Sequence, residues 1–182
     1  MQPPDLSTAA KWPGVPASYG WLSLDRRGNW RLQGKPVTHA GLVAFLNRNY
    51  GSDSSGRWFV QNGPQRVFTT LDYTPFVLRL EVDGSVTVHT GTDAGAVESV
   101  HLDDEGSVLL KTAQGVGLLD DRDLANFIAS CCRDDRTPAN DVDFFDVMSG
   151  AFLGLFWRGR RVQPIGRDEV PAHFGFDPNP SP

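Results

Sequence analysis

A hydroxyl-rich stretch in the first half of the chain has the residue types that best suit a ligand site. The segment FTTLDYTPFVL, residues 68–78, has the composition of a β-strand, but a proline interrupts it. Because proline removes a backbone donor, we expect an exposed turn or bulge there. Asp72 would then offer an acceptor, Tyr73 and Thr74 hydroxyl groups, and Phe76 an apolar wall. In the alternative interpretation, Asp72 only caps the turn.

A basic residue precedes this turn and completes the candidate ligand site. Arg66 would supply a cation if its hairpin folds back toward the turn. We expect the site to lie in a crevice where two units of the chain meet, because crevices bury ligand surface without opening either core. The alternative is a small enzyme with a non-motif active site in the same crevice, with Asp72, Tyr73 and His89 as contributors.

The remaining acids and histidines do not have the spacing of a metal site. His39, His89, His101 and His173 show no H-x-x-x-H spacing. The acids of DDRD, residues 120–123, are typical of a helix N-terminus. The segment DDRTPANDVDFFD lacks the glycine and terminal glutamate of a calcium loop. The sequence therefore predicts no metal and no cofactor.

Catalytic signatures are also missing from the sequence. No Gly-rich phosphate loop and no G-x-S-x-G elbow occurs, and Ser149 has no accompanying base. Whether the protein is an enzyme stays open, with a non-catalytic role favoured and the catalytic residues unknown.

The segment FWRGRRV, residues 156–162, alternates aromatic and basic residues. Arg158, Arg160 and Arg161 with the two aromatics would suit a strand that stacks bases and contacts phosphates. The favoured alternative is a hairpin whose arginines face solvent while Phe156 or Trp157 packs inward.

Two distant segments indicate the architecture that positions these residues. LSLDRRGNWRL (22–32) and VHLDDEGSVLL (100–110) share Leu, Asp, Gly and Leu at the same relative positions, and each predicts a hairpin. An amphipathic helix follows each hairpin, with Thr38 and Asp120 as N-caps and Gly51 just past the end of the first helix.

The second helix is expected within residues 119–132 and to carry the only two cysteines. Cys131 and Cys132 would then be reduced, structural thiols on the helix, with at least one packed beneath it. A strained disulfide between these neighbours is the alternative.

The fold class that follows is α+β, with two similar units in tandem, each a curled antiparallel sheet packed on one amphipathic helix. Further strands are expected around turns at Gly63, Gly84 and Gly159. We predict a Pro-rich N-terminal segment (1–18), an N-terminal unit (19–92), a C-terminal unit (93–170) and a Pro-rich tail (171–182) with little to pack. Two units of this kind are expected to superpose over residues 22–50 and 100–132.

Composition limits the classes of partner. The 182 residues are 40% hydrophobic, enough for a sizeable core, and the net charge of −5 argues against a broad nucleic-acid or membrane surface. The sequence contains no apolar run long enough to span a membrane and no signal peptide. We therefore expect a cytoplasmic protein without membrane contact; its oligomeric state stays open.

Residues 21–90 resemble a proteobacterial family known as domain of unknown function 1285. The residues that carry the resemblance are Gly28, Trp30, Gly34, Pro36, Val37, Leu42, Val43, Asp72, Pro75 and Phe76. The resemblance implies a two-unit α+β protein with repeated motifs, no established activity and a role in ligand binding or signalling. QNGPQRV stands where the family pattern has a Thr-Pro-Val-Glu run, so this chain lacks the acidic residue.

The leading functional hypothesis is a non-catalytic module that binds a small molecule or a protein partner, with a regulatory role in signal transduction. Its candidate ligand-binding residues are Arg66, Asp72, Tyr73, Thr74 and Phe76. The second hypothesis is the enzyme described above. Weak nucleic-acid binding through the hairpin at Arg158–Arg161 ranks third, so a nucleic-acid partner is not expected.

Overall fold

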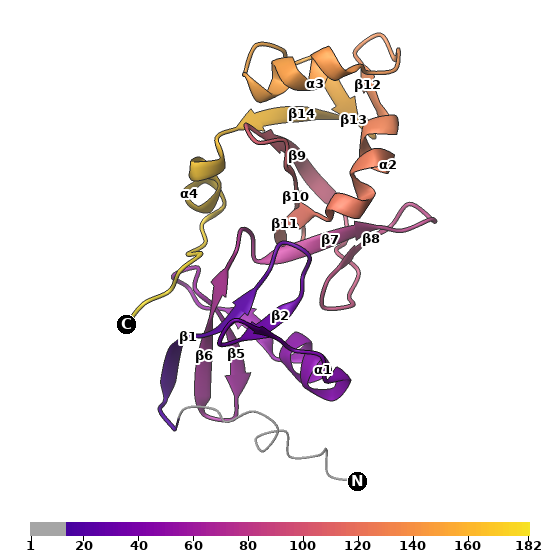
Figure 1. Ribbon diagram of the computed structural model, residues 1–182. Helices are drawn as coiled ribbons and strands as arrows, with labels where there is room; N and C mark the ends of the chain where they lie inside the picture. The colour runs from indigo at the N-terminus through magenta and orange to yellow at the C-terminus, as the bar shows by residue number, and fades with distance from the viewer. Residues whose placement is uncertain (1–13) are drawn as a thin grey trace. The chain divides into compact units, whose positions relative to one another are not determined.

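The computed structural model describes residues 14–182, which form two compact units. The first unit contains the chain up to Tyr73 and also the last eight residues, Gly175–Pro182; the second contains Thr74–Phe174 (Figure 1). The chain is a mixed α+β protein with two curled sheets and few helices, as the sequence predicts at this level.

The first unit is a six-stranded sheet with one helix. Its strand order is β3-β2-β1-β6-β5-β4, and α1 (Ala40–Arg48) connects β3 to β4. The strands are β1 (Ala17–Leu24), β2 (Trp30–Leu32), β3 (Lys35–Pro36), β4 (Tyr50–Ser52), β5 (Trp58–Asn62) and β6 (Gln65–Leu71). All neighbours are antiparallel except β1 and β6, which run parallel with Leu24 opposite Leu71.

Helix α1 closes the core of this unit. Leu42 and Leu46 are buried on one face of the helix, as its apolar spacing predicts. Trp30 from β2 is buried, and its Nε1 donates to Asn47 Oδ1 at 2.7 Å. The N-cap is His39, whose Nδ1 accepts from the Leu42 backbone, so the predicted cap at Thr38 is off by one residue.

The second unit is an eight-stranded sheet with the order β12-β13-β14-β9-β10-β11-β7-β8. Its strands are β7 (Phe76–Leu80), β8 (Val86–Val88), β9 (Val97–Asp103), β10 (Val108–Thr112), β11 (Gly115–Leu119), β12 (Cys131–Arg133), β13 (Leu155–Trp157) and β14 (Arg160–Ile165). Two of its pairs, β9 with β14 and β11 with β7, are parallel. The prediction of purely antiparallel sheets is therefore wrong, because both sheets contain parallel pairs.

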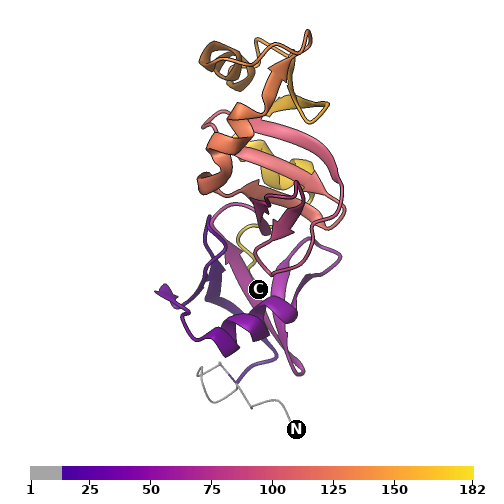
Figure 2. The same ribbon diagram turned by 90° about the vertical axis from the view of Figure 1, so that its right-hand side faces the viewer.

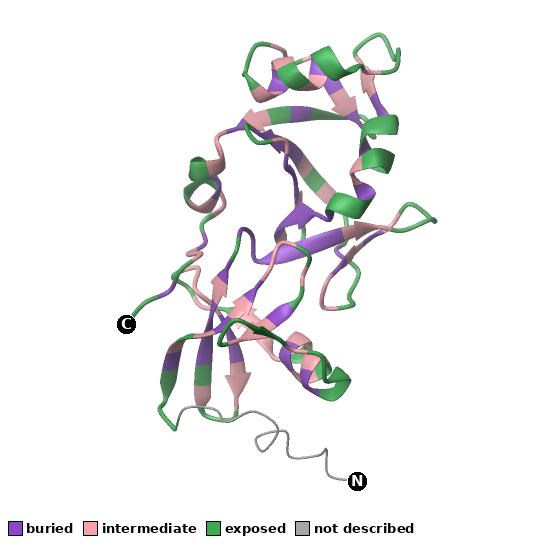
Figure 3. Ribbon diagram, viewed as in Figure 1, coloured by how far each residue is buried: buried purple, intermediate pink, exposed green. Residues whose placement is uncertain are grey.

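Short helices cover the second sheet. They are α2 (Leu124–Ala129), α3 (Asp141–Met148) and α4 (Val170–Phe174), with 3-10 turns η2 (Asp121–Asp123) and η3 (Arg167–Glu169). Helices α2 and α4 lie on opposite sides of β9, β10 and β11 (Figure 1), and Figure 2 shows the same helices from the side. Buried residues line β9, β10 and β11 between them (Figure 3).

The two hairpins anticipated from the sequence have matching turns. In the first, Asp25 N donates to Asn29 O, Gly28 N donates to Asp25 O, and Gly28 has φ 77°. In the second, Asp103 N donates to Ser107 O, Gly106 N donates to Asp103 O, and φ of Gly106 is 85°. Each aspartate also caps its turn, because one carboxylate oxygen accepts two backbone N–H groups from the following residues.

Connectivity also corresponds between the sheets. In the first sheet the hairpin β1–β2 leads through β3 and α1 to β4, β5 and β6, and β6 returns parallel to β1. In the second, β9–β10 leads through β11 and α2 to β12, β13 and β14, and β14 returns parallel to β9. The pair β7–β8 extends only the second sheet.

The helix predicted within residues 119–132 is much shorter than expected. Leu119 ends β11, α2 spans only Leu124–Ala129, and both cysteines lie on β12. A helix position for Cys131 and Cys132 is therefore wrong. The apolar spacing that suggested a long helix continues into a strand, where Cys131 pairs with Trp157 and is buried.

Two segments pack in places that the sequence does not predict. The hairpin around Gly84, predicted within residues 19–92, pairs with β11 in the sheet of the second unit. The tail, predicted to have little to pack, contributes the buried side chain of Phe176 to the first unit. Of the N-terminal segment 1–18, residues 1–13 lie outside the described residues.

Within the part of the chain that the structure describes, none of the helices is both long and apolar enough to cross a bilayer.

The two thiols are expected to differ in reactivity. Burial, together with the neighbouring Cys132, raises the pKa of Cys131 to about 12, so its reactive thiolate is scarce at neutral pH. Cys132 is partly exposed. With Ellman's reagent at pH 8, we expect one fast thiol and one at least ~10-fold slower. Cys132→Ser should leave only the slow thiol; equal rates in the folded protein would contradict this assignment.

Candidate functional site

The boundary between the two units divides the predicted ligand residues. Arg66, Asp72 and Tyr73 belong to the first unit, whereas Thr74 and Phe76 belong to the second. Asp72 is exposed as expected, but Tyr73 and Thr74 are buried, so an exposed hydroxyl-rich edge does not form.

In the first unit, the end of β6 lies beside the β1–β2 turn. The parallel pairing of Leu24 with Leu71 ends at a hydrogen bond from Asp72 N to Leu24 O of 3.0 Å. This register brings Asp72 close to the turn that Asp25 begins. We call the group formed by Asp25, Arg26, Arg31, Asp72 and Tyr73 the turn cluster.

Arg31 is the cation at the centre of the turn cluster. Its guanidinium lies 3.2 Å from an Asp25 carboxylate oxygen and 3.9 Å from an Asp72 carboxylate oxygen. The side chains of Arg31 and Asp72 are each 41% exposed, whereas that of Asp25 is 13% exposed. Arg31 therefore forms a close ion pair with the largely buried carboxylate of Asp25. Its contact with the carboxylate of Asp72 is longer and exposed to solvent, and we call it the open pair.

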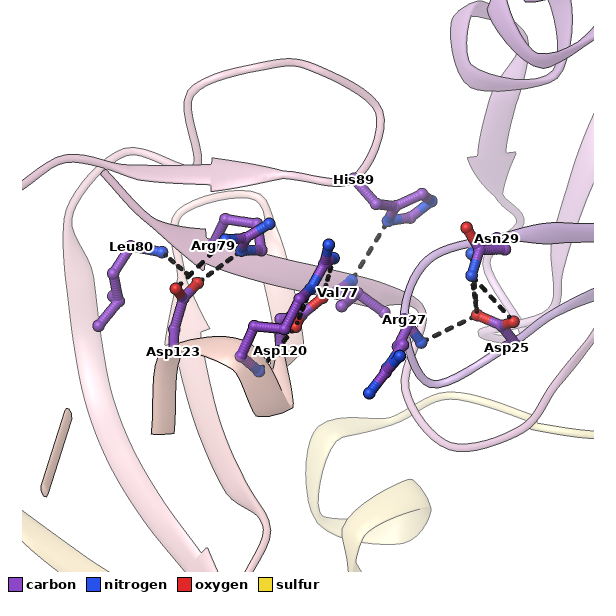
Figure 4. A network of polar contacts seen from close by, with 10 residues as sticks. Asp25, Arg27, Asn29, Val77, Arg79, Leu80, His89, Asp120 and Asp123 are labelled. Atoms are coloured by element: carbon purple, nitrogen blue, oxygen red, sulfur yellow. Dashed lines mark hydrogen bonds and ion pairs between the residues drawn. The ribbon is translucent and has the colours of Figure 1, made fainter. Parts of the chain in front are cut away.

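Asp25 is held in its charged form by the turn. Burial acts to raise the pKa of Asp25, but donation from the Asn29 backbone and side chain, from the Arg27 backbone and the charge of Arg31 outweigh it. The net effect lowers its pKa. Figure 4 shows the carboxylate receiving these turn donors. A fixed carboxylate of this kind anchors Arg31 in one orientation.

Tyr73 gives the turn cluster an aromatic support. Its ring is buried, and the Arg26 guanidinium lies 4.9 Å from the ring centroid, within the range of a cation–π contact. The neighbouring Arg27 is exposed. The cluster thus combines a fixed aromatic ring with basic residues and one accessible carboxylate.

Arg66 lies away from the turn cluster. It is near the start of β6, opposite Ala17, and six residues from Asp72, which is roughly 20 Å along a strand. Its guanidinium stacks 4.5 Å from the centroid of Phe59. The hairpin does not fold back, because β6 continues straight between β1 and β5.

The second-unit residues of the predicted site connect strands of its sheet. Thr74 Oγ1 donates to Phe76 O at 2.7 Å and accepts from Leu118 N at 2.9 Å. Phe76 packs against Gly115, where an added Cβ would lie 3.0 Å from the ring. His89 Nδ1 accepts from Val77 N at 3.2 Å, so this nitrogen supports β7.

Two acids of residues 120–123, Asp120 and Asp123, form ion pairs at the start of α2 (Figure 4). Asp120 caps the first turn and binds Arg122 through both carboxylate oxygens, which lowers its pKa to about 2. Asp123 accepts from Arg79 Nε at 2.6 Å and from Leu80 N at 3.0 Å. The predicted role at a helix N-terminus is confirmed. Across residues 14–182, no three metal-ligating side chains form a group.

A serine and two histidines that no sequence motif connects lie together in the second unit. Ser99 Oγ is 3.0 Å from His101 Nε2, and the His101 and His173 ring centroids are 5.5 Å apart. Burial, reinforced by the charge of His173, lowers the pKa of His101 to about 4. His101 is therefore neutral at pH 7 and a weak base. Ser99 and His101 are two residues apart on β9, so strand alternation places them on the same face of the sheet, and this was the signal available in the sequence. The contact of His101 with His173 on α4 depends on the tertiary fold.

The arginines of the hairpin β13–β14 contact the protein itself. Arg158 stacks 4.4 Å from the ring of Trp157, which is buried, and Arg161 lies 5.6 Å from the ring of Phe156. Arg160 donates to Glu98 O at 3.2 Å. An inward-packed tryptophan supports the hairpin interpretation over a nucleic-acid strand.

A shallow hollow of about 270 Å³ lies beside the ends of α3 and β14. Its carboxylates come from Asp104 and Glu169. Both already accept backbone donors, Asp104 from Arg167 N at 2.8 Å and Glu169 from Gly166 N at 3.2 Å. These acids therefore hold the chain around η3.

Comparison with known proteins places the chain among families without an assigned activity. The family model described as "DUF2944: Protein of unknown function (DUF2946)" matches residues 6–181. None of the curated proteins is significantly similar to the chain.

Two solved structures are similar to this chain. A DUF1285 family protein from Silicibacter pomeroyi DSS-3 has 15% identity and a TM-score of 0.55, with 93% of this chain and 92% of that chain covered. A DUF1285 family protein from Shewanella baltica OS155 has 19% identity and a TM-score of 0.46, with 59% and 90% covered. The structure from Silicibacter pomeroyi therefore has a similar fold to this chain. The resemblance to proteobacterial DUF1285 proteins that was inferred from the sequence is confirmed.

Thr74 is expected to stabilise the second unit. Thr74→Val keeps the shape of the side chain but leaves the buried Leu118 N–H without its acceptor, which typically costs about 1–3 kcal/mol. Urea unfolding should show this loss in the free energy of unfolding. Thr74→Ser keeps the hydroxyl and should be less destabilised. A valine variant as stable as the parent would contradict the structural role.

Proposed function

The chain belongs to the family whose model is described as "DUF2944: Protein of unknown function (DUF2946)", and we propose that it is a non-catalytic binding module with a regulatory role. The observation that carries the proposal is the open pair formed by Arg31 and Asp72, which are 3.9 Å apart and equally exposed. A cation and an anion held side by side at the surface match a ligand that carries both a negative group and a hydrogen-bond donor.

Arg31 is suited to receive the negative group of such a ligand. Asp25 orients its guanidinium from the buried side, and this orientation is set before a ligand arrives. A planar guanidinium with fixed orientation binds a carboxylate or phosphate through paired hydrogen bonds. The exposed Arg27 adds positive charge at the same turn.

Asp72 is suited to receive the donor of the ligand. Its backbone N–H is bonded to Leu24 O, which fixes the main chain while the carboxylate extends toward solvent. At 3.9 Å, its contact with Arg31 is longer than a hydrogen bond, so a ligand can enter between them without breaking a strong pair. Small zwitterions such as α-amino acids have the required arrangement.

The alternative, an enzyme, has Ser99 and His101 as its best-placed nucleophile and base. Efficient general bases have a pKa near the working pH, and the pKa of His101 is about 4. A base this weak activates a serine hydroxyl poorly. Ser99 and His101 are therefore poorly suited to act as a catalytic nucleophile and base.

We further propose that the two units are structural repeats. The matching turns at Asp25 and Asp103 and the matching strand order support this proposal. The partner would be a small polar molecule or a protein, and the site of action the cytoplasm.

A thermal-shift screen tests the proposed site. The panel contains α-amino acids, small carboxylic acids, inorganic phosphate and nucleotides. A ligand that binds only the folded state stabilises it by about 2.7 kcal/mol at a hundredfold excess over its dissociation constant. We expect a hit whose shift is lost in Arg31→Ala and in Asp72→Asn, because each variant removes one half of the open pair.

The pair formed by Lys111 and Glu98 supplies a matched control. It is also a surface ion pair, 3.1 Å long, and it lies on the second unit. Lys111→Ala should leave the ligand shift unchanged. A ligand whose shift survives both Arg31→Ala and Asp72→Asn would place its binding site elsewhere and overturn the proposal.

A further inference from the structure

The last eight residues, Gly175–Pro182, follow the second unit in sequence but belong to the first unit. We call them the tail. They form no helix or long strand, yet two of their side chains, Phe176 and Pro180, are buried. The surface of the first unit that receives them, around Gly56, Arg57 and Leu71, is called the tail seat.

Backbone hydrogen bonds hold the tail in its seat. Asp177 N donates to Gly56 O at 2.9 Å, and Leu71 N donates to Pro178 O at 2.8 Å. Asp177 also forms a parallel bridge with Arg57. Recognition through main-chain groups is typical of sites that bind an extended peptide.

The seat and the tail approach each other closely at Gly56. Gly56 has φ 74°, and a Cβ at this position would collide with the carbonyl oxygen of Gly175 and lie 3.0 Å from Phe176 Cα. Phe176 is only 8% exposed, so its apolar side chain is removed from solvent. Asp177 shapes the segment by accepting from Asn179 N at 3.0 Å.

We propose that the tail seat is a peptide-binding site for a Gly-Phe-Asp-Pro segment, and that it accepts the tail of a second copy of this chain as well as its own. All the seat atoms named above belong to residues 56–71. The same contacts therefore form whether the tail is covalently attached or comes from another molecule. Exchange of tails between copies joins them without any new interface.

Peptide exchange on the full chain tests the site. A protease recognition sequence is inserted between Phe174 and Gly175, and the folded protein is cleaved. A fluorescent peptide of residues 174–182 is then added, and its anisotropy is measured. We expect saturable binding that unlabelled peptide competes. Phe176→Ala in the peptide should weaken binding at least ~10-fold, whereas Ser181→Ala, at an exposed position, should change it less than ~2-fold.

A glycine pair provides the control on the protein side. Gly56 and Gly63 both have positive φ, but nothing lies within 4 Å of a Cβ added at Gly63. Gly56→Ala should therefore reduce peptide affinity at least ~10-fold, and Gly63→Ala, which carries the same backbone strain, should not. Equal losses of peptide affinity in the two variants would overturn the proposed role of the tail seat.

The remaining outcomes also decide the proposal. A cleaved protein that stays folded by circular dichroism but binds no peptide overturns it. If cleavage unfolds the protein, restoration of the melting transition by added peptide supports the proposal, and no restoration overturns it. Uncut protein refolded at high concentration should contain a dimer that is absent without residues 175–182. A monomer at every concentration would overturn exchange between copies.

Discussion

The parallel pairing of an early strand with a late strand is the constraint on which both sheets depend. In the first unit β1 pairs with β6, and in the second β9 pairs with β14. The first sheet consists of two antiparallel halves that meet only at this pair. In the second sheet the pair joins β12, β13 and β14 to β9, β10 and β11, and a further parallel pair adds β7 and β8. A hairpin and a helix separate the partners in sequence, so neither sheet is complete until its last strand has formed.

The same pairing creates the turn cluster. Because β1 and β6 run parallel, they end at the same edge of the sheet, and the residue after β6 meets the turn after β1. Asp72 thus lies near Arg31, which comes from the second strand of the hairpin, and Asp25 fixes that arginine. An antiparallel pair would place the end of β6 beside the start of β1 and separate these charges.

Local features were predictable from the sequence, whereas contacts across the sheet were not. The turns at Gly28 and Gly106 follow from an aspartate three residues before a glycine, and the buried face of α1 follows from its spacing. The parallel register carries no local signal, so Arg31 was not recognised as the neighbour of Asp72. The apolar residues of α2 and β12 merge into one helical pattern because a short helix passes directly into a strand.

Native-state hydrogen exchange of the second unit tests the dependence on parallel pairing most directly. The amides of Val100 and Leu102 on β9 and of Gln163 and Ile165 on β14 face this pair. We predict that they are among the slowest to exchange and share one opening free energy, because the two halves of the sheet open together. Protected amides on β9 and β10 beside rapidly exchanging amides on β14 would contradict this dependence.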